Sequence, residues 1–299
     1  MGISREQALD CFRSDDLVGI GMEADAVRRR LHPESVVSYV VERSIDGTAF
    51  VDANSEAILS EVGDAVELGC AGIRLLGAGG LERLESLIGH VRERFPSLWI
   101  EALPAAEVLA VAQGSGLRLG EALARLCAAG LDSITGDGEE IGLQEWIEVH
   151  RAAHGVGMRT VATGIFGAGE TLEQRVEFLE AVRNLQEETG GFSAFVPVSA
   201  EAPGGRELDG MTAVERLKTL AIARMFLDNI ENVQASRAGQ GLKVLQMGLR
   251  FGANDVGRVD GGGAGAENGT SEEDLRRIIR DAGFQPAQRD AAYRTMFLN

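Results

Sequence analysis

The stretch from Val40 to Val62 reads VVERSIDGTAFVDANSEAILSEV. It begins as an apolar run, crosses a polar turn and enters a segment with apolar residues at helical spacing, namely Ile58 and Val62, followed just beyond the stretch by Ala65 and Val66. An apolar strand that leads directly into an amphipathic helix is one strand–helix unit. If the unit repeats along the chain, it predicts a parallel α/β fold.

The unit does repeat. Eight short runs rich in Val, Ile, Leu, Phe or Ala are expected to be strands: Val36–Ile45, Gly72–Gly77, Leu98–Leu103, Ser133–Gly136, Arg159–Phe166, Ala194–Val198, Val233–Arg237 and Phe251–Val256. Amphipathic segments separate them, and one of these opens with the capping-box pair Thr171 and Gln174 and closes on Gly190. Strands that alternate with helices in this number predict an α/β fold of the (β/α)8 TIM-barrel class, with flanking N- and C-terminal helices.

No Pro- or Ser-rich linker divides the 299 residues, so the sequence predicts a single domain over 1–299. Within it we expect an N-terminal helical segment at 1–35, with Ser4–Leu31 helical, and the barrel at 36–256. A Gly-rich loop at 257–269 and a C-terminal helical tail at 270–299 follow. The Gly-rich loop is either a flexible connection or a lid over the barrel mouth.

The chain is strongly acidic, with 29 Lys and Arg against 46 Asp and Glu and a net charge of -17. Such a surface repels nucleic acid and anionic membranes, so neither is expected as a partner. No apolar run approaches the ~20 residues of a membrane span, and no signal peptide is visible. These features predict a soluble, cytoplasmic protein. The three cysteines, Cys11, Cys70 and Cys127, lack any tight ligand spacing and are expected to be partly buried thiols.

Five stretches carry a family resemblance: SDDLVGIGMEADAVRRRLHPESVVSYVVERSI, AGLDSITGDGEEI, GMRTVATGIFGAGETLEQRVEFLEAVRNLQEETGGFSAFVP, NIENVQASRAGQGLKVLQMGLRFGANDVG and RRIIRDAGFQPAQR. Together they resemble the cyclic dehypoxanthinyl futalosine synthase family, radical S-adenosylmethionine enzymes of the futalosine pathway of menaquinone biosynthesis. The resemblance covers almost the whole chain. It implies a radical-SAM-like barrel with its site at the C-terminal ends of the strands.

The chain departs from that family at several strand ends. The family follows its first strand with C-x3-C-x2-C, which binds a [4Fe–4S] cluster, whereas this chain reads DGTAFVDANSEA after Ile45. Glycines are displaced in LLGAGG, Ala168 replaces a histidine in GAGET, and Arg237 replaces an aromatic residue in ASR. A Gly-rich run also replaces the segment that the family carries after GAND. These departures lead us to expect no iron–sulfur cluster and no S-adenosylmethionine.

Six residues near strand ends are the candidate ligand-binding residues: Glu170, Gln234, Ser236, Arg237, Asn254 and Asp255. Glu170 either accepts hydrogen bonds from sugar hydroxyls of a ligand or is simply stabilised by a helix N-terminus. Asn254 and Asp255 either point into the barrel mouth or form a strand-end turn. Arg237 could bind a carboxylate or phosphate bidentately, or pair with Asp255 and close the site.

No metal site is expected. Asp137, Glu139 and Glu140 cluster after the fourth strand, but a solvated loop explains them as well as a cation site does. His150 and His154 share one face of a helix, which could ligate a metal. That helix lies outside the barrel, so both are read as surface or packing residues.

Two functions stay open. The first is a pseudoenzyme without radical chemistry that binds a nucleoside-like or carboxylate small molecule, or a partner, as a homo-oligomer or with a cluster-containing homologue. The second is a repurposed enzyme that does polar acid–base chemistry on a futalosine-like nucleoside or carboxylate in the same pathway. The catalytic residues are unknown in either case.

Overall fold

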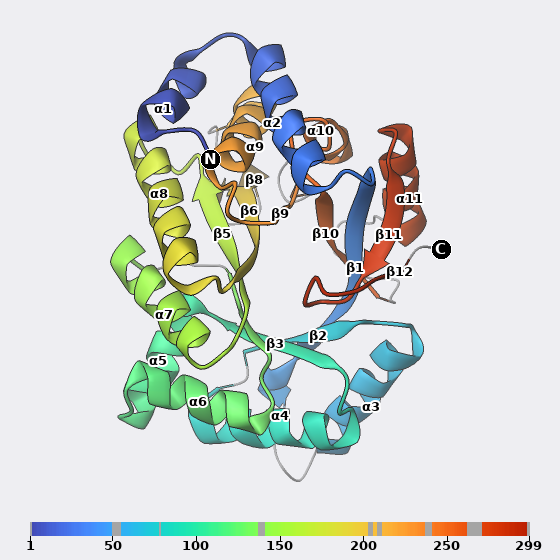
Figure 1. Ribbon diagram of the computed structural model, residues 1–299. Coiled ribbons are helices and arrows are strands. Elements are labelled where there is room, and N and C mark those ends of the chain that lie inside the picture. Colours follow the sequence, from blue (N-terminus) through green and yellow to red (C-terminus); the bar gives the residue numbers. More distant parts are fainter. Residues whose placement is uncertain are drawn as a thin grey trace.

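Parallel strands surrounded by helices form a barrel, and Figure 1 looks approximately along it. The structure is a computed structural model that describes residues 2–49, 55–77, 79–136, 141–202, 206–207, 211–236, 241–261 and 271–297. In these residues the barrel strands are β1 (Val36–Asp46), β2 (Gly72–Leu76), β3 (Trp99–Pro104), β4 (Ser133–Thr135), β5 (Thr160–Phe166), β6 (Phe192–Ser199), β9 (Asn232–Val233) and β10 (Asp255–Asp260). The predicted (β/α)8 class is confirmed.

Hydrogen bonding divides the ring into two arcs. One arc joins β10, β1, β2, β3 and β4, and the other joins β5, β6 and β9, with every pair parallel. A parallel bridge between Gln234 and Asp255 connects the arcs on one side, and β4 contacts β5 on the other. Apolar residues fill the space between the strands and the helices, which explains why the strand runs read as almost continuously apolar.

The described helices are α1 (Arg5–Arg13), α2 (Leu17–Leu31), α3 (Ser55–Glu67), α4 (Leu81–Arg94), α5 (Ala105–Ser115), α6 (Leu119–Ala129), α7 (Leu143–Gly155), α8 (Leu172–Thr189), α9 (Ala213–Phe226), α10 (Gly241–Gly248) and α11 (Glu272–Asp281), with a 3-10 turn η1 (Gly47–Ala49). None of them is long and apolar enough to cross a membrane. The expected helix over Ser4–Leu31 is two helices, because the Asp16 side chain accepts a hydrogen bond from Gly19 N and starts a new one. The capping box of Thr171 and Gln174 is confirmed.

The expected helical tail at 270–299 is wrong beyond α11. Residues Gln285–Arg289 form a strand, β11, that pairs in parallel with the first residues of β1. A short strand, β12 (Met296–Phe297), then returns antiparallel to it. The physical reason is an open edge: β2 pairs with β1 only from Glu42 onward, so the first part of β1 has backbone groups that β11 satisfies.

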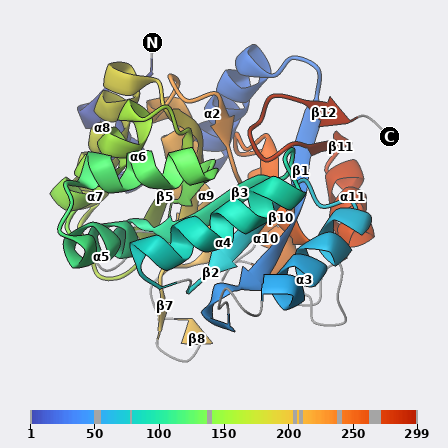
Figure 2. The ribbon, with the colours of Figure 1, turned by 90° about the horizontal axis from the view of Figure 1, so that it is seen from below.

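The two ends of the barrel differ. In Figure 2 the hairpin of β7 (Glu201–Ala202) and β8 (Arg206–Glu207) lies at one end, and β11 and β12 lie at the other. The hairpin follows β6 and marks the C-terminal end of the strands, whereas β11 marks the N-terminal end. The expected Gly-rich loop at 257–269 begins later than predicted, because β10 continues to Asp260. Residues 262–269 of that loop lie outside the described residues.

Candidate ligand-binding site

A cavity of about 620 Å³ lies at the C-terminal end of β5, beside α7 and α8, and we call it the rim cavity. Its apolar lining includes the rings of Trp146, Phe166 and Phe178. Its polar lining includes Thr163, Glu170, Gln174, Arg175 and Glu177. A mainly apolar hollow with a few polar groups, at the C-terminal end of barrel strands, has the properties of a small-molecule site.

Glu170, a candidate from the sequence, lies in the rim cavity with both oxygens engaged. Its Oε1 accepts from Gly167 N at 2.8 Å and its Oε2 accepts from Ala168 N at 2.9 Å. Its Oε1 also lies 2.6 Å from Nε of the buried Arg175. The carboxylate therefore shapes the loop after β5 and compensates the Arg175 charge, and it has little capacity left for a ligand.

Glu177 offers a better acceptor in the same cavity. It is exposed, it follows Arg175 on α8, and it has no hydrogen bond or ion pair to another residue in the part of the chain that the structure describes. The aromatic ring of the half-buried Phe178 stands next to it in the sequence. A carboxylate beside an aromatic surface can accept hydrogen bonds from hydroxyl groups while the ring packs against an apolar or planar part of the same molecule.

A second cavity, of about 240 Å³, lies inside the barrel, and we call it the lumen cavity. Gln234 and Ser236, two candidates from the sequence, line it, whereas Ala235 between them is buried in the core. The predicted alternation along this stretch is therefore observed. Arg237, the next candidate, lies outside the described residues, as do Asp137, Glu139 and Glu140.

Charged side chains from three neighbouring strands also line the lumen cavity. Arg74 on β2 forms an ion pair with Glu101 on β3, with 2.9 Å between Nη2 and Oε2. Burial raises the pKa of Glu42 on β1, and the negative charge of Glu101 raises it further. A carboxyl group in these surroundings takes up a proton more readily than one in water.

Asn254 and Asp255 lie at the N-terminal end of the barrel, so their expected place at the mouth is wrong. The sequence FGAND was expected to close a strand, but β10 starts at Asp255 and runs to Asp260. The error came from assigning the apolar residues before Asp255 to the strand, although Phe251 and Gly252 form the turn that precedes it.

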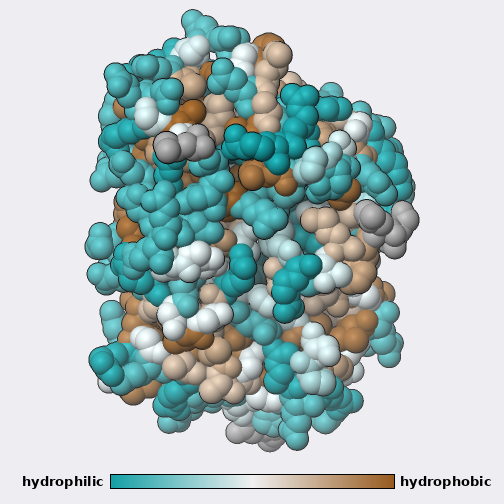
Figure 3. Space-filling view, in the orientation of Figure 1, coloured by the Kyte–Doolittle hydropathy of each residue, from teal (hydrophilic) through white to brown (hydrophobic). Residues whose placement is uncertain are grey.

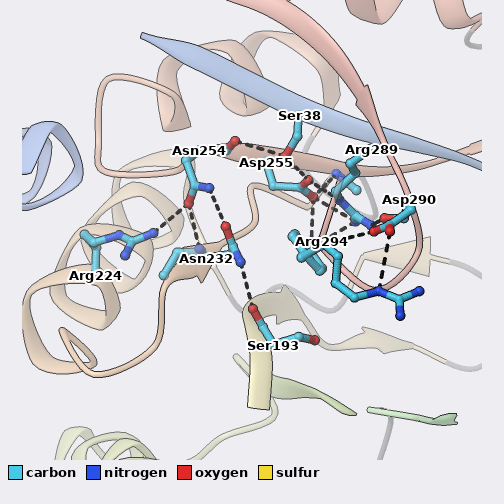
Figure 4. Close-up of polar contacts among 12 residues, drawn as sticks. Ser38, Ser193, Arg224, Asn232, Asn254, Asp255, Arg289, Asp290 and Arg294 are labelled. Atoms are coloured by element: carbon cyan, nitrogen blue, oxygen red, sulfur yellow. Dashed lines mark hydrogen bonds and ion pairs between the residues drawn. The ribbon is translucent and has the colours of Figure 1, made fainter. Parts of the chain in front are cut away.

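Both side chains belong to buried polar networks (Figure 4). Asp255 Oδ2 accepts hydrogen bonds from Ser38 Oγ at 2.6 Å and from Arg289 Nε at 2.6 Å. Its Oδ1 accepts from Gly257 N at 2.7 Å. Arg289 comes from β11, so this ion pair lies at the N-terminal end of the barrel, where β11 pairs with β1.

The Asn254 amide connects three elements. Its Oδ1 accepts from Arg224 Nη2 at 2.7 Å and from Val233 N at 2.9 Å, and its Nδ2 donates to Asn232 Oδ1 at 2.9 Å. Asn232 in turn donates to Ser193 O at 2.9 Å. Every polar atom of the Asn254 side chain is thus used inside the protein, which indicates a structural role.

Replacing Asn254 by alanine should therefore lower the free energy of unfolding by about 1–3 kcal/mol, because it leaves Nη2 of the buried Arg224 and the backbone N of Val233 without an acceptor. Urea unfolding measures the loss. Ligand affinity at the rim cavity should not change in the folded fraction. A variant with unaltered stability would contradict the structural role.

His150 and His154 are packing residues, as the sequence predicts. His150 is fully buried, its Nδ1 lies 2.9 Å from Thr160 Oγ1, and its ring centroid lies 4.2 Å from that of Trp146. His154 Nε2 lies 2.9 Å from the same hydroxyl. Burial lowers the pKa of His150 to about 3 and, with the nearby positive charge of Arg159, that of His154 to about 4.

Sequence reasoning missed Glu42, Arg74, Glu101 and Arg175. Three of them interrupt apolar strand runs, as in VVERS, GIRLL and WIEAL. Burying an ionisable residue inside a barrel without a partner costs free energy. A charged residue within an apolar strand run therefore indicates a paired or functional side chain, and these three could have been predicted from the sequence. Arg175 had no comparable signal, because an arginine in the first turns of an amphipathic helix is usually exposed.

The fold defines the class of protein, a (β/α)8 TIM barrel. The crystal structure of methylornithine synthase (PylB) superposes with a TM-score of 0.68 over 97% of this chain and 96% of that chain, at 15% identity. At that identity the likeness concerns the fold alone.

Sequence comparisons then give the family. Residues 189–298 match the CofH/MqnC C-terminal region. Cyclic dehypoxanthine futalosine synthase from Streptomyces coelicolor is 34% identical over 97% of this chain and 85% of its own length. The 5-amino-6-(D-ribitylamino)uracil--L-tyrosine 4-hydroxyphenyl transferase of Methanothermobacter thermautotrophicus is 36% identical over 83% of this chain and 76% of its own length. The chain belongs to the cyclic dehypoxanthine futalosine synthase family, and its homologues are enzymes related to the futalosine pathway of menaquinone biosynthesis.

This membership contradicts the expectation that the [4Fe–4S] cluster and S-adenosylmethionine are absent, because the homologues are radical SAM enzymes that normally use both. The expectation rested on the sequence after Ile45, and residues 50–54 of that loop lie outside the described residues. In the described ranges, no group of three or more His, Cys, Asp or Glu could hold a metal ion. Cys11, Cys70 and Cys127 are free thiols on or next to different elements. The described residues therefore do not fit a [4Fe–4S] cluster.

Proposed function

We propose that the chain binds a nucleoside-like small molecule of the futalosine type in the rim cavity. The observation that carries the proposal is the combination of an aromatic lining with the uncommitted carboxylate of Glu177 at the C-terminal end of β5. The volume of about 620 Å³ lies within the range of small-molecule pockets. A carboxylate is also a common partner of ribose hydroxyls in nucleotide sites.

Binding, rather than acid–base chemistry, is the role that the rim cavity supports best. A general base needs a carboxylate with a free lone pair within reach of the proton that it removes. Glu170 is saturated by Gly167 N, Ala168 N and Arg175, and Glu177 is exposed to solvent. Neither carboxylate is both buried and free to take a proton from a substrate.

Replacing Glu177 by glutamine should weaken nucleoside binding about tenfold, the effect of losing one hydrogen bond to a charged acceptor. Phe178→Ala should weaken it as well by removing an aromatic surface of the cavity. Isothermal titration with dehypoxanthine futalosine and with adenosine measures both effects. Glu173→Gln is the matched control, because Glu173 lies on the same helix but forms an exposed ion pair with Arg13. Equal affinities of the Glu177 and Glu173 variants would overturn the proposed site.

A second candidate function rests on Glu42 and Glu101. A buried carboxyl group of raised pKa beside a second carboxylate in the lumen is an arrangement used for proton transfer, and it supports the alternative of a repurposed acid–base enzyme. Turnover of either probe with a bell-shaped pH profile, lost in Glu42→Gln and kept in Glu177→Gln, would favour this alternative over simple binding.

A further inference from the structure

The lumen cavity extends to the N-terminal end of the barrel, which is opposite the rim cavity. Trp99, Ser133 and Ser193 line it from the starts of β3, β4 and β6, and Arg159 lines it from the residue before β5. Figure 3 views the molecule from this end and shows a hollow near the middle of the face, bordered largely by hydrophilic residues. The turn after β11 partly covers the opening with Ala291, Ala292 and Tyr293.

Most of the charges in this cavity are matched. Arg74 pairs with Glu101, and Arg289 pairs with Asp255. Arg258 provides the largest of the positive charges that lower the pKa of Glu42. Each carboxylate of the cavity thus already has a cation, so its negative charge is compensated before any ligand arrives.

Arg159 is the exception. Its side chain lines the cavity, the residue is exposed, and its guanidinium makes no hydrogen bond or ion pair to another residue in the described ranges. Its backbone carbonyl accepts from Ser133 Oγ at 2.8 Å, which fixes the start of the arginine side chain against β4. The opening therefore presents one uncompensated cation in a cavity that Trp99 also lines.

We propose that this N-terminal opening binds a small oxyanion, the carboxylate of a compact organic acid or a phosphate, through the guanidinium of Arg159. A guanidinium accepts either group as a bidentate partner. The cavity of about 240 Å³ limits the ligand to a few heavy atoms, and the face of Trp99 can pack against its apolar part. Thr163 lines both cavities, but Arg159 and Trp99 do not line the rim cavity, and Glu177 and Phe178 do not line the lumen cavity, so the two proposed sites bind through different residues.

Because the exterior of the protein is acidic, anion binding is expected at this opening and not over the surface in general. With a net charge of -17, the molecule repels anions at a distance, so an anion binds only where a local cation and a fitted surface outweigh that repulsion. Raising the ionic strength screens the long-range repulsion more than the contact. Oxyanion affinity should therefore fall only weakly with added sodium chloride.

Isothermal titration of the full chain with inorganic phosphate and with succinate tests the proposal. The probe that binds more tightly shows whether the opening prefers a phosphate or a carboxylate. We expect saturable binding of at least one probe, weakened about tenfold or more in Arg159→Gln. Ala291→Phe, which fills the opening, should weaken it too. Arg277→Gln is the control, because Arg277 is an exposed arginine on α11.

Absence of saturable binding by both probes would overturn the inference, and so would an Arg159→Gln variant that binds like the parent protein. Loss of oxyanion binding in the Arg277→Gln control would show that binding depends on the overall charge of the protein, and it would also overturn the inference. None of these outcomes bears on nucleoside binding at the rim cavity, because Glu177→Gln leaves the N-terminal opening intact. The two proposals therefore fail independently.

Discussion

Replacing Asp255 by alanine is expected to destabilise the protein by about 3–5 kcal/mol, because it leaves the Arg289 guanidinium buried without its counter-charge. Asp255 is fully buried and Arg289 is 4% exposed, so solvent cannot take over the lost interaction. Ser38 and Tyr293 also lose an acceptor. Equilibrium unfolding in urea, followed by circular dichroism, measures the loss.

Glu173→Gln provides the matched control, since it removes one partner of an ion pair that is about half exposed on both sides. Exposed pairs of this kind contribute about 0–1 kcal/mol. A second variant, Asp255→Leu with Arg289→Met, removes both charges and should recover part of the stability that Asp255→Ala loses. A loss from Asp255→Ala as small as that of the control would show that the ion pair does not stabilise the barrel.

Acidification should destabilise the protein through His150 and His154. Their pKa values in the folded state are about 3 and about 4, whereas an unfolded histidine has a pKa of about 6.5. Between these limits the unfolded chain binds more protons than the folded chain, so stability falls as the pH is lowered below about 6.5. The slope approaches about 1.4 kcal/mol per pH unit for each histidine that stays neutral in the fold.

His150→Leu isolates this effect, because leucine cannot be protonated and suits the apolar surroundings of Trp146 and Phe192. The free energy of unfolding of the variant, measured at intervals from pH 7 to about pH 4.5, should decline less steeply than that of the parent protein. His90→Gln is the control, since His90 is a half-buried histidine on α4 outside this cluster. Parallel declines in parent and His150 variant would contradict the assignment.

The strand–helix alternation made the barrel predictable, because buried parallel strands are apolar on both faces and read as short continuous runs. The run Val36–Ile45 matches β1 to within one residue. The same criterion misplaced the last strand. Phe251 and Ala253 are apolar because they pack against the core before the strand begins. The strand β10 starts at Asp255, and its charged residues hid it from a search for apolar runs.

The candidate site was less predictable, since a site depends on which side chains meet across the barrel. Gln234 and Ser236 were placed correctly on one face by the twofold period of a strand. Asp255 was expected to bind a ligand, with a pair to Arg237 as an alternative, whereas the structure pairs it with Arg289 of β11, whose sequence QPAQR carries no strand pattern. Such a strand forms only because β1 offers it an edge, and this information is not local in the sequence.

The pairing of β11 with β1 has a consequence for the nascent chain. It joins segments about 250 residues apart, so every residue from β1 to β11 must leave the ribosome before the first half of β1 can pair with β11. Until then β1 exposes an apolar edge, VVSYV, which is a template for pairing with another chain. Pairing of β11 with β1 is thus the step that ends the aggregation-prone period, and chaperones would act on this edge mainly before it.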